Sequence, residues 1–315
     1  MAGFPPNEFR VHPSPPPGRV APPRSGRRLL RARRRSHLGG VARRVNRPPA
    51  ETIALELYSR AEAHPGDSLL QFGSLLGAYQ YLPLYRLFRN YVPEGARVLD
   101  WGAGNGHFSY YLQRSGYRAS GYSLLDGSFL RWLPDRDYPF LRGDEREPVQ
   151  LPYADGSFDA VASVGVLEHV RETGGSEAGS LAEIARVLRP GGVFACYHFP
   201  NRSSWIDWAA RRVPGKHHHE FRFTRSDIES LTAGAGLRLL EAGRYGVLPR
   251  NFGHRLPAAL RRSRALAEAW DGLDSVLAVP LSTWCQNHYF VALKGDPATS
   301  SGGRIDRNAE KSSTS

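Results

Sequence analysis

The stretch Ala96-Arg-Val-Leu-Asp-Trp-Gly-Ala-Gly-Asn-Gly-His107 decides the predicted fold. It opens with a short apolar run that ends in the carboxylate of Asp100. A turn follows that contains three glycines, Gly102, Gly104 and Gly106. Apolar residues at helical spacing begin at Phe108. A strand, a glycine turn and a helix in this order indicate a ligand site at the carboxyl end of a parallel strand, because glycine lets the backbone approach a ligand closely.

The glycine spacing separates this turn from two common nucleotide-binding motifs. A dinucleotide-binding turn reads Gly-x-Gly-x-x-Gly, but His107 occupies the position of its last glycine. No Gly-Lys-Ser/Thr follows the turn, which excludes a P-loop. The turn therefore predicts a different ligand, or a tight turn that needs glycine for structural reasons alone.

Strand-like and helical segments alternate along the chain, which predicts a doubly wound α/β fold with a mainly parallel sheet. A helix near residues 224–236 has Thr224 and Asp227 in a capping-box pattern. We expect N-terminal helices, and helical inserts after the fifth strand and between the sixth and seventh. The seven expected strands are residues 96–100, 117–123, 139–143, 158–165, 193–199, 237–247 and 284–294.

Charge divides the chain into a core and tails. The net charge is +12, but residues 1–50 alone carry twelve Arg, one acidic residue and ten Pro. Such a segment cannot bury enough apolar area to offset its ordering entropy. We therefore predict a disordered tail over residues 1–49, a domain over 50–295 and a second disordered tail over 296–315. The arginines could contact nucleic acid, an anionic membrane or an acidic partner, or could simply be solvated.

Composition also limits the compartment. Two cysteines are too few for a disulfide framework, so we expect free thiols in a reducing environment. No apolar run approaches the ~18 residues that a membrane span needs, and the N-terminus lacks the apolar core of a secretory signal. The expected location is the cytoplasm.

Four segments in register resemble class I S-adenosylmethionine-dependent methyltransferases of the type 11 kind. The resemblance extends over roughly residues 70–295 and implies a Rossmann-like fold with S-adenosylmethionine as the cofactor. The four segments are Val98–His107, Leu151–Val161, Val166–Val170 and Glu183–Gly192.

The resemblance also implies roles for single residues. Asp100 would organise the turn beside the methionine part of the cofactor, for which Gly102, Gly104 and Gly106 make room. Asp144 matches the carboxylate that binds the adenine amino group, although it could also be a turn residue beside Gly143. Backbone contacts are implied for the end of the fourth strand, at Val164 and Gly165.

One position departs from the family pattern. The second strand of this family usually ends in a carboxylate that binds both ribose hydroxyls, and Ser123 stands there instead. A hydroxyl makes one such bond but not the bidentate one. This departure keeps open a non-catalytic protein on the same fold.

Methyl transfer from a sulfonium depends mainly on positioning the nucleophile. A general base is needed only when the acceptor must lose a proton. The first candidates are His169 and His219, and His198, His254 and His288 are further ones. His219 ends the run His217-His-His219, which could form the acceptor pocket, a metal site or a solvated loop. We expect no metal site, because consecutive residues rarely converge on one ion.

The acceptor itself is expected to be a small molecule, a lipid or a lipid-linked glycan. A nucleic-acid acceptor is suggested only by the arginines, because residues 51–315 are nearly neutral. Residues 199–212 carry Trp205 and Trp208 at amphipathic spacing. They could form a lid, a surface helix for a lipid-like substrate or, as we expect first, a core-packing helix. The basic tail could add a peripheral membrane contact.

Overall fold

The computed structural model describes residues 47–216, 218–250 and 252–295. The two predicted tails fall outside these ranges, except for residues 47–49, so the proposed domain boundaries remain predictions. His217 also lies outside the described residues.

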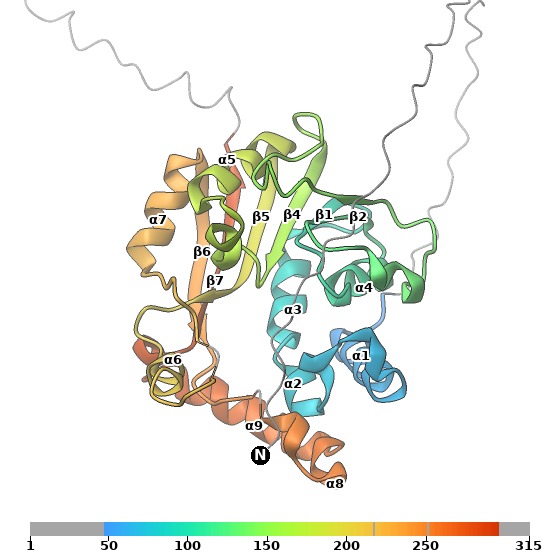
Figure 1. Cartoon of the computed structure of the whole chain (residues 1–315), viewed down its shortest axis with the longest axis vertical. Coiled ribbons are helices and arrows are strands. Elements are labelled where there is room, and N and C mark those ends of the chain that lie inside the picture. The colour runs from blue at the N-terminus through green and yellow to red at the C-terminus, as the bar shows by residue number, and fades with distance from the viewer. Residues whose placement is uncertain (1–46, 217, 251, 296–315) are drawn as a thin grey trace, which may run out of the picture. The chain divides into compact units, whose positions relative to one another are not determined.

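A seven-stranded sheet forms the centre of the domain, in the order β3-β2-β1-β4-β5-β7-β6 (Figure 1). Neighbouring strands pair in parallel from β3 to β5, whereas β7 runs antiparallel to both β5 and β6. The predicted doubly wound fold is confirmed. The strands are β1 (Arg97–Trp101), β2 (Arg118–Ser123), β3 (Phe140–Arg142), β4 (Phe158–Val164), β5 (Leu188–Pro200), β6 (Leu237–Tyr245) and β7 (Asn287–Lys294).

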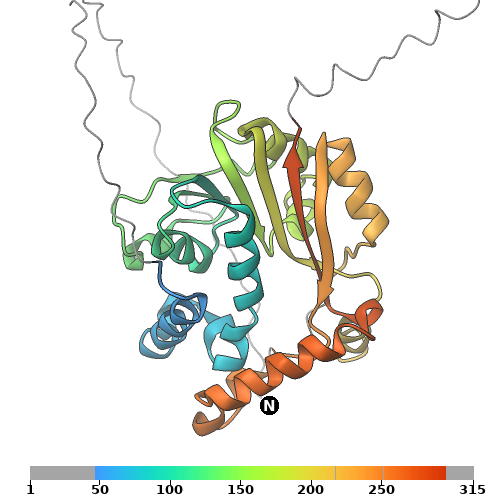
Figure 2. The same ribbon diagram turned by 180° about the vertical axis from the view of Figure 1, so that it is seen from behind.

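Helices cover both faces of the sheet, because successive strand residues point to opposite sides. Val98 packs with the N-terminal helices in one buried cluster, while its neighbour Leu99 packs with α5 and α7 in another. Figure 1 shows α5 in front of the sheet, and Figure 2 shows α3 on the other side. The helices are α1 (Ala50–Ala63), α2 (Leu75–Tyr79), α3 (Leu82–Tyr91), α4 (His107–Arg114), α5 (Glu177–Val187), α6 (Trp205–Ala210), α7 (Arg225–Gly234), α8 (Ala258–Arg261) and α9 (Arg264–Leu277).

Most expected segments are confirmed within a few residues, and two expectations need correction. The predicted capping box is present, with Thr224 and Asp227 bonded reciprocally at the start of α7. Residues 68–91 carry helical apolar spacing, which predicts one of the expected N-terminal helices, but the structure breaks this segment into α2, α3 and a short 3-10 turn, Leu70–Phe72. The expectation of a core-packing helix at residues 199–212 was wrong. Helix α6 lies at the surface, with Trp205 and Trp208 40% and 58% exposed.

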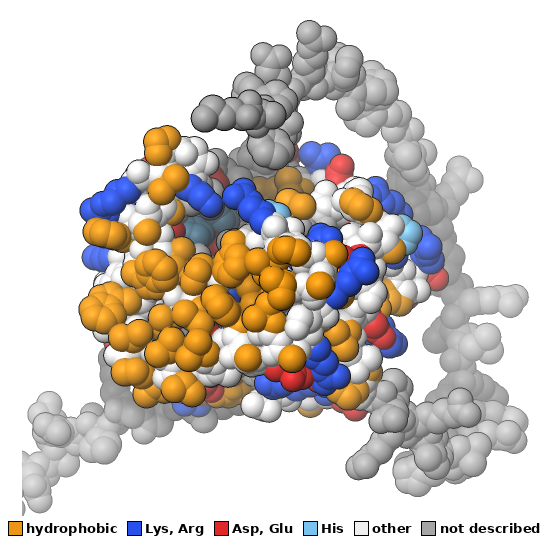
Figure 3. Space-filling model, turned by 90° about the horizontal axis from the view of Figure 1, so that it is seen from below, with side chains coloured by type: hydrophobic (Ala, Val, Ile, Leu, Met, Phe, Trp, Pro, Cys, Tyr) orange, Lys and Arg blue, Asp and Glu red, His pale blue; other side chains and the backbone are white. Residues whose placement is uncertain are grey.

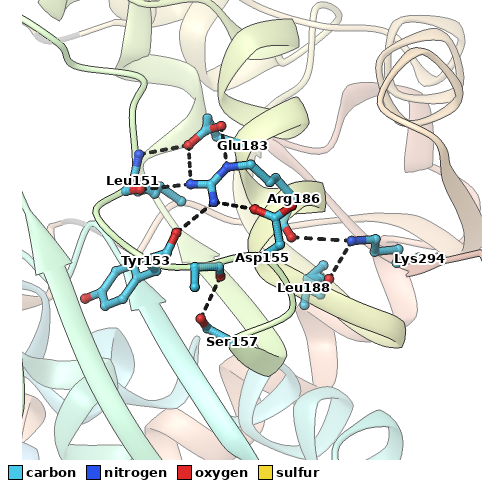
Figure 4. Close-up of polar contacts among 9 residues, drawn as sticks. Leu151, Tyr153, Asp155, Ser157, Glu183, Arg186, Leu188 and Lys294 are labelled. Atoms are coloured by element: carbon cyan, nitrogen blue, oxygen red, sulfur yellow. Dashed lines mark hydrogen bonds and ion pairs between the residues drawn. The ribbon is translucent and has the colours of Figure 1, made fainter.

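One guanidinium ties together the approach to β4 and the helix that precedes β5 (Figure 4). Arg186, near the end of α5, donates to the backbone oxygens of Leu151 and Tyr153 at 2.9 and 2.7 Å. It also pairs with Asp155 and with Glu183, which in turn accepts the backbone N–H of Leu151 at 3.0 Å. Two segments that carry the family resemblance are thus cross-linked by a single side chain.

Both cysteines are buried free thiols, as expected. Within the described residues, no helix is both long and apolar enough to cross a bilayer.

Candidate active site

The glycine turn leaves β1 and enters α4, and all three glycines have positive φ. A Cβ atom at Gly102 or Gly106 would collide with the side chain of Val166 or Phe129, so these two glycines permit close packing. At Gly104 a Cβ would meet only the carbonyl oxygen of Gly102, at 3.6 Å. Gly104 is therefore the glycine whose missing side chain leaves room for a ligand.

A cavity of about 430 Å³ opens at the carboxyl ends of β1 and β4. These strands are neighbours in the sheet, and the chain connections diverge to opposite sides between them, which is where doubly wound proteins bind ligands. A larger cavity of about 650 Å³ lies beside α7 and shares no lining residue with the cavity at the glycine turn. Six of the predicted site residues line the smaller cavity: Gly102, Gly104, Val164, Gly165, His169 and His219.

Asp100 lies below the turn and does not line this cavity. Its side chain is 1% exposed and accepts the Ser109 hydroxyl of α4 at 2.6 Å. The Tyr138 hydroxyl donates to Ser109 in turn, at 3.0 Å. Burial raises the pKa of Asp100 to about 7, although the bonds from Ser109 work in the opposite direction. Asp100 thus joins the end of β1 to α4 on either side of the glycine turn.

The predicted adenine and ribose positions make local contacts only. The Ser123 hydroxyl accepts the backbone N–H of Leu125 at 3.1 Å, and Asp144 accepts that of Arg146 at 2.9 Å. Ser123 is buried, Asp144 is exposed, and neither lines the cavity. Gly106 does not line the cavity either. Asp144 is placed as a turn residue would be, and the cofactor roles of Ser123 and Asp144 stay predictions.

His198 is held in an unusual backbone conformation at the wall of the cavity. Its φ is +64°, in the left-handed region that non-glycine residues rarely adopt and that often marks functional sites. Its backbone N–H donates to the Tyr245 hydroxyl at 2.8 Å, and the same hydroxyl lies 3.0 Å from Nδ1 of the His198 ring, within hydrogen-bond distance. Burial lowers the pKa of His198 to about 3, so the ring is neutral.

Aromatic rings close the wall between the turn and the N-terminal helices. Tyr81 packs edge-on against both His107 and His198, with ring centres 4.7 and 5.3 Å away. Burial lowers the pKa of His107 to about 3. Buried polar atoms without a partner among the described residues include both ring nitrogens of His107, Nε2 of His198 and Oε2 of Glu168. Buried polar groups are normally paired, so these atoms indicate a polar ligand in the cavity.

Glu168, His169 and His219 meet on one side of the cavity. One ligand atom of each lies within 4.8 Å of the others, so these side chains could hold a metal ion. Each histidine has a carboxylate at Nδ1: Glu172 lies 2.8 Å from His169, and Asp207 lies 3.2 Å from His219. Burial raises the pKa of Glu168 to about 8.

A further cavity, of about 490 Å³, is lined mainly by apolar side chains of α6 and of the segment after β6, and we call it the apolar cavity. It shares two lining residues, His219 and Gln286, with the cavity at the glycine turn. His219 therefore stands at the junction of a polar and an apolar space.

Sequence reasoning missed several residues of this site. Tyr81 and Tyr245 carry no motif in the sequence. His107 lies within the glycine-turn stretch, but the sequence assigned it no role in the site. Glu168 and His198 carried a signal: Glu168 precedes a candidate base, and His198 is a histidine inside an otherwise apolar strand.

Comparison with known proteins identifies the family of this chain. Residues 77–242, more than half of the chain, match the family described as a methyltransferase domain. An uncharacterized methyltransferase of Synechocystis sp. is 27% identical over 173 residues, which cover 53% of this chain and 77% of that protein. The demethylmenaquinone methyltransferase of Deinococcus radiodurans is 30% identical over 49% of this chain, and the fatty-acid O-methyltransferase of Mycolicibacterium smegmatis is 36% identical over 32%. These two matches span 58% and 36% of the relatives' own lengths.

The chain belongs to the methyltransferase-domain family. It is a class I methyltransferase that depends on S-adenosylmethionine. The residues present fit this cofactor, because the cavity combines the open side of Gly104 with unpartnered buried polar atoms.

Proposed function

We propose that this enzyme methylates an apolar, lipid-like small molecule that bears a hydroxyl or carboxylate group. The observation that carries the proposal is the apolar cavity that adjoins the cofactor cavity at His219 and Gln286. Two relatives act, by their names, on a demethylmenaquinone and on fatty acids, which are molecules of this kind.

The surface around the apolar cavity supports the same class of acceptor. Figure 3 shows hydrophobic side chains gathered over the face formed by α6, α8 and α9, with basic groups at its margin. We call this surface the apolar face. Its exposed members include Trp205, Trp208, Val213, Phe252, Leu260, Leu273, Val276, Val279 and Trp284. Exposed apolar patches of this kind mark binding grooves or interaction sites.

In the proposed reaction the chain mainly positions two molecules and excludes water. Bound S-adenosylmethionine supplies an electrophilic methyl group. Gly102, Gly104 and the end of β4 at Gly165 would hold its methionine part, and the buried Nε2 of His198 would offer one hydrogen bond. Tyr81 and His107 keep that side of the cavity closed. The polar end of the acceptor reaches the junction at His219, while its apolar part fills the apolar cavity. Such positioning can account for much of the rate enhancement of a transfer reaction.

A cavity-filling variant tests this arrangement. Ala210 lines the apolar cavity, and Ala233 on α7 is an exposed alanine away from it. We expect Ala210→Phe to raise the KM for a long-chain fatty acid or a reduced prenylated naphthoquinone at least tenfold, with the affinity for S-adenosylmethionine unchanged. Ala233→Phe should change neither.

The readout is formation of S-adenosylhomocysteine with each acceptor and with a water-soluble catechol. Turnover of the catechol alone, or apolar turnover that Ala210→Phe leaves unaffected, would exclude a lipid-like acceptor in this cavity.

A further inference from the structure

We propose that Glu168, His169 and His219 bind a divalent transition-metal cation at the junction of the two cavities. The residues come from two distant segments: Glu168 and His169 follow β4, and His219 lies in the loop after α6. Their potential ligand atoms lie within 4.8 Å of one another. Glu168 and His169 are neighbours in the sequence, but His219 joins them only in the folded chain.

The partners of the two histidines support a metal site. Metal-binding histidines usually donate the other ring N–H to a carboxylate, which fixes the tautomer and orients the ring. Glu172 and Asp207 stand in that position at Nδ1 of His169 and His219. In this tautomer Nε2 carries the lone pair that a cation needs.

Glu168 supplies the independent observation that points to a ligand. Its side chain is 4% exposed, and Oε2 is buried with no partner among the described residues. His169 Nε2 lies 3.9 Å from the other oxygen, Oε1. A cation between these groups would satisfy the buried carboxylate, which is otherwise costly to leave unpaired.

The size of the cluster is compatible with closure around an ion. Ligand atoms at zinc distances in a tetrahedral site are about 3.4 Å apart. Side-chain rotations that bring the ligand atoms closer together by little more than about one ångström would therefore suffice. Two imidazoles and one carboxylate suit Zn²⁺, Co²⁺ or Fe²⁺ better than Mg²⁺ or Ca²⁺, which prefer oxygen ligands. Three protein ligands leave a position open toward the cavity, as in catalytic sites.

The location assigns the cation a role in the reaction, and this role rests on the proposed function. An acceptor oxygen bound at the open position would lose its proton more easily, because the cation lowers its pKa. His169 and His219 would then be ligands and not the general bases expected from the sequence.

Metal titration tests the site without cofactor or acceptor, so its outcome is independent of the proposed function. The full chain, free of any polyhistidine tag and treated with a chelator, is titrated with Zn²⁺ by calorimetry and with Co²⁺ by visible absorption. We expect one equivalent to bind with micromolar or tighter affinity. His219→Ala should weaken binding at least 100-fold, and Asp207→Asn by 10- to 100-fold.

His218→Ala is the matched control, because His218 is the exposed neighbour on the same loop. It should bind both ions as the unchanged chain does. His169→Gln is a second ligand variant in case His219→Ala fails to fold, and thermal unfolding reports the folded state of each. Absence of one-to-one binding, or equal affinity in folded His219→Ala or His169→Gln, would overturn the proposal.

Discussion

Gly104 and Asp100 show how much a single residue contributes to this site. Both belong to the stretch that predicts the fold, but the structure gives them different tasks. Gly104 faces the cavity, whereas Asp100 is sealed beneath the turn and bonded to Ser109. A substitution at Gly104 would therefore change ligand affinity by direct contact. A substitution at Asp100 would change it by shifting α4.

We expect Gly104→Val to lower the affinity for S-adenosylmethionine at least tenfold, because the new side chain enters the cavity. Positive φ at this residue will also cost about 1–2 kcal/mol of stability. Gly174→Val is the matched control: its φ is +83° and no atom lies within 4 Å of its Cβ position. Calorimetric titration of the cofactor separates the two effects. Equal loss of affinity in both variants would mean that backbone strain alone is responsible.

Asp100→Asn should reveal a pH dependence of stability. Burial raises the pKa of Asp100 to about 7, above the value of about 4 in an unfolded chain. The neutral native carboxyl therefore stabilises the fold at low pH, and this contribution is lost as the pH rises from about 4 to about 7. One pH unit between the two pKa values corresponds to about 1.4 kcal/mol, so the loss is on the order of a few kcal/mol.

The asparagine variant keeps an oxygen for Ser109 but does not titrate. The free energy of unfolding is measured with urea at pH 5, 6 and 7.5. As the pH rises, the value for the variant should increase relative to the value for the unchanged chain. A difference that stays constant with pH would contradict the buried position of the Asp100 carboxyl.

At the scale of elements, helices α5 and α6 differ in how far the local sequence predicts their surroundings. Helix α5 carries Arg186. Arg186 lies in the segment Glu183–Gly192, which resembles the family, and near the end of α5. Helix α6 has the spacing of a core helix but none of its burial, because apolar periodicity says which side chains share a face and not what that face contacts.

Arg186→Met should lower the free energy of unfolding by about 2 kcal/mol, because it leaves the backbone oxygens of Leu151 and Tyr153 without their donor. The guanidinium is about a third exposed, which limits the effect. Arg225→Met is the control. Arg225 also donates to a backbone oxygen, that of Ala242, and pairs with Glu229, but both contacts are exposed, so water can replace the donor and the loss should be less than about 0.5 kcal/mol. Urea unfolding of both variants gives the comparison, and equal losses would contradict the bracing role of Arg186.

At the scale of the whole molecule, the sheet brings the glycine turn of β1 beside the end of β4. Three residues of the apolar face, Trp205, Val213 and Phe252, line the cavity that adjoins this site. An acceptor that partitions into membranes would be collected most easily if this face meets a lipid surface. Trp and basic residues together are typical of interfacial contacts.

We expect Trp208→Ser combined with Val276→Ser to reduce sedimentation of the full chain with phosphatidylglycerol-containing vesicles severalfold. Both side chains are more than half exposed, so stability should change little. Leu125→Ser is the control, because Leu125 is 64% exposed after β2 and outside the apolar face. Unchanged vesicle binding in the double variant would show that the apolar face does not contact lipid.

The sequence by itself determined the order of strands and helices and the glycine turn. These features depend on neighbours close in the chain: apolar periodicity, helix caps and the backbone freedom of glycine. The class of cofactor followed from the family resemblance of four segments. Only the tertiary structure decided that Val166 and Phe129 pack against Gly102 and Gly106 while Gly104 keeps open space, that Tyr245 holds His198 and that His219 joins Glu168. Those contacts link residues tens of positions apart, and packing of the sheet, not local propensity, brings them together.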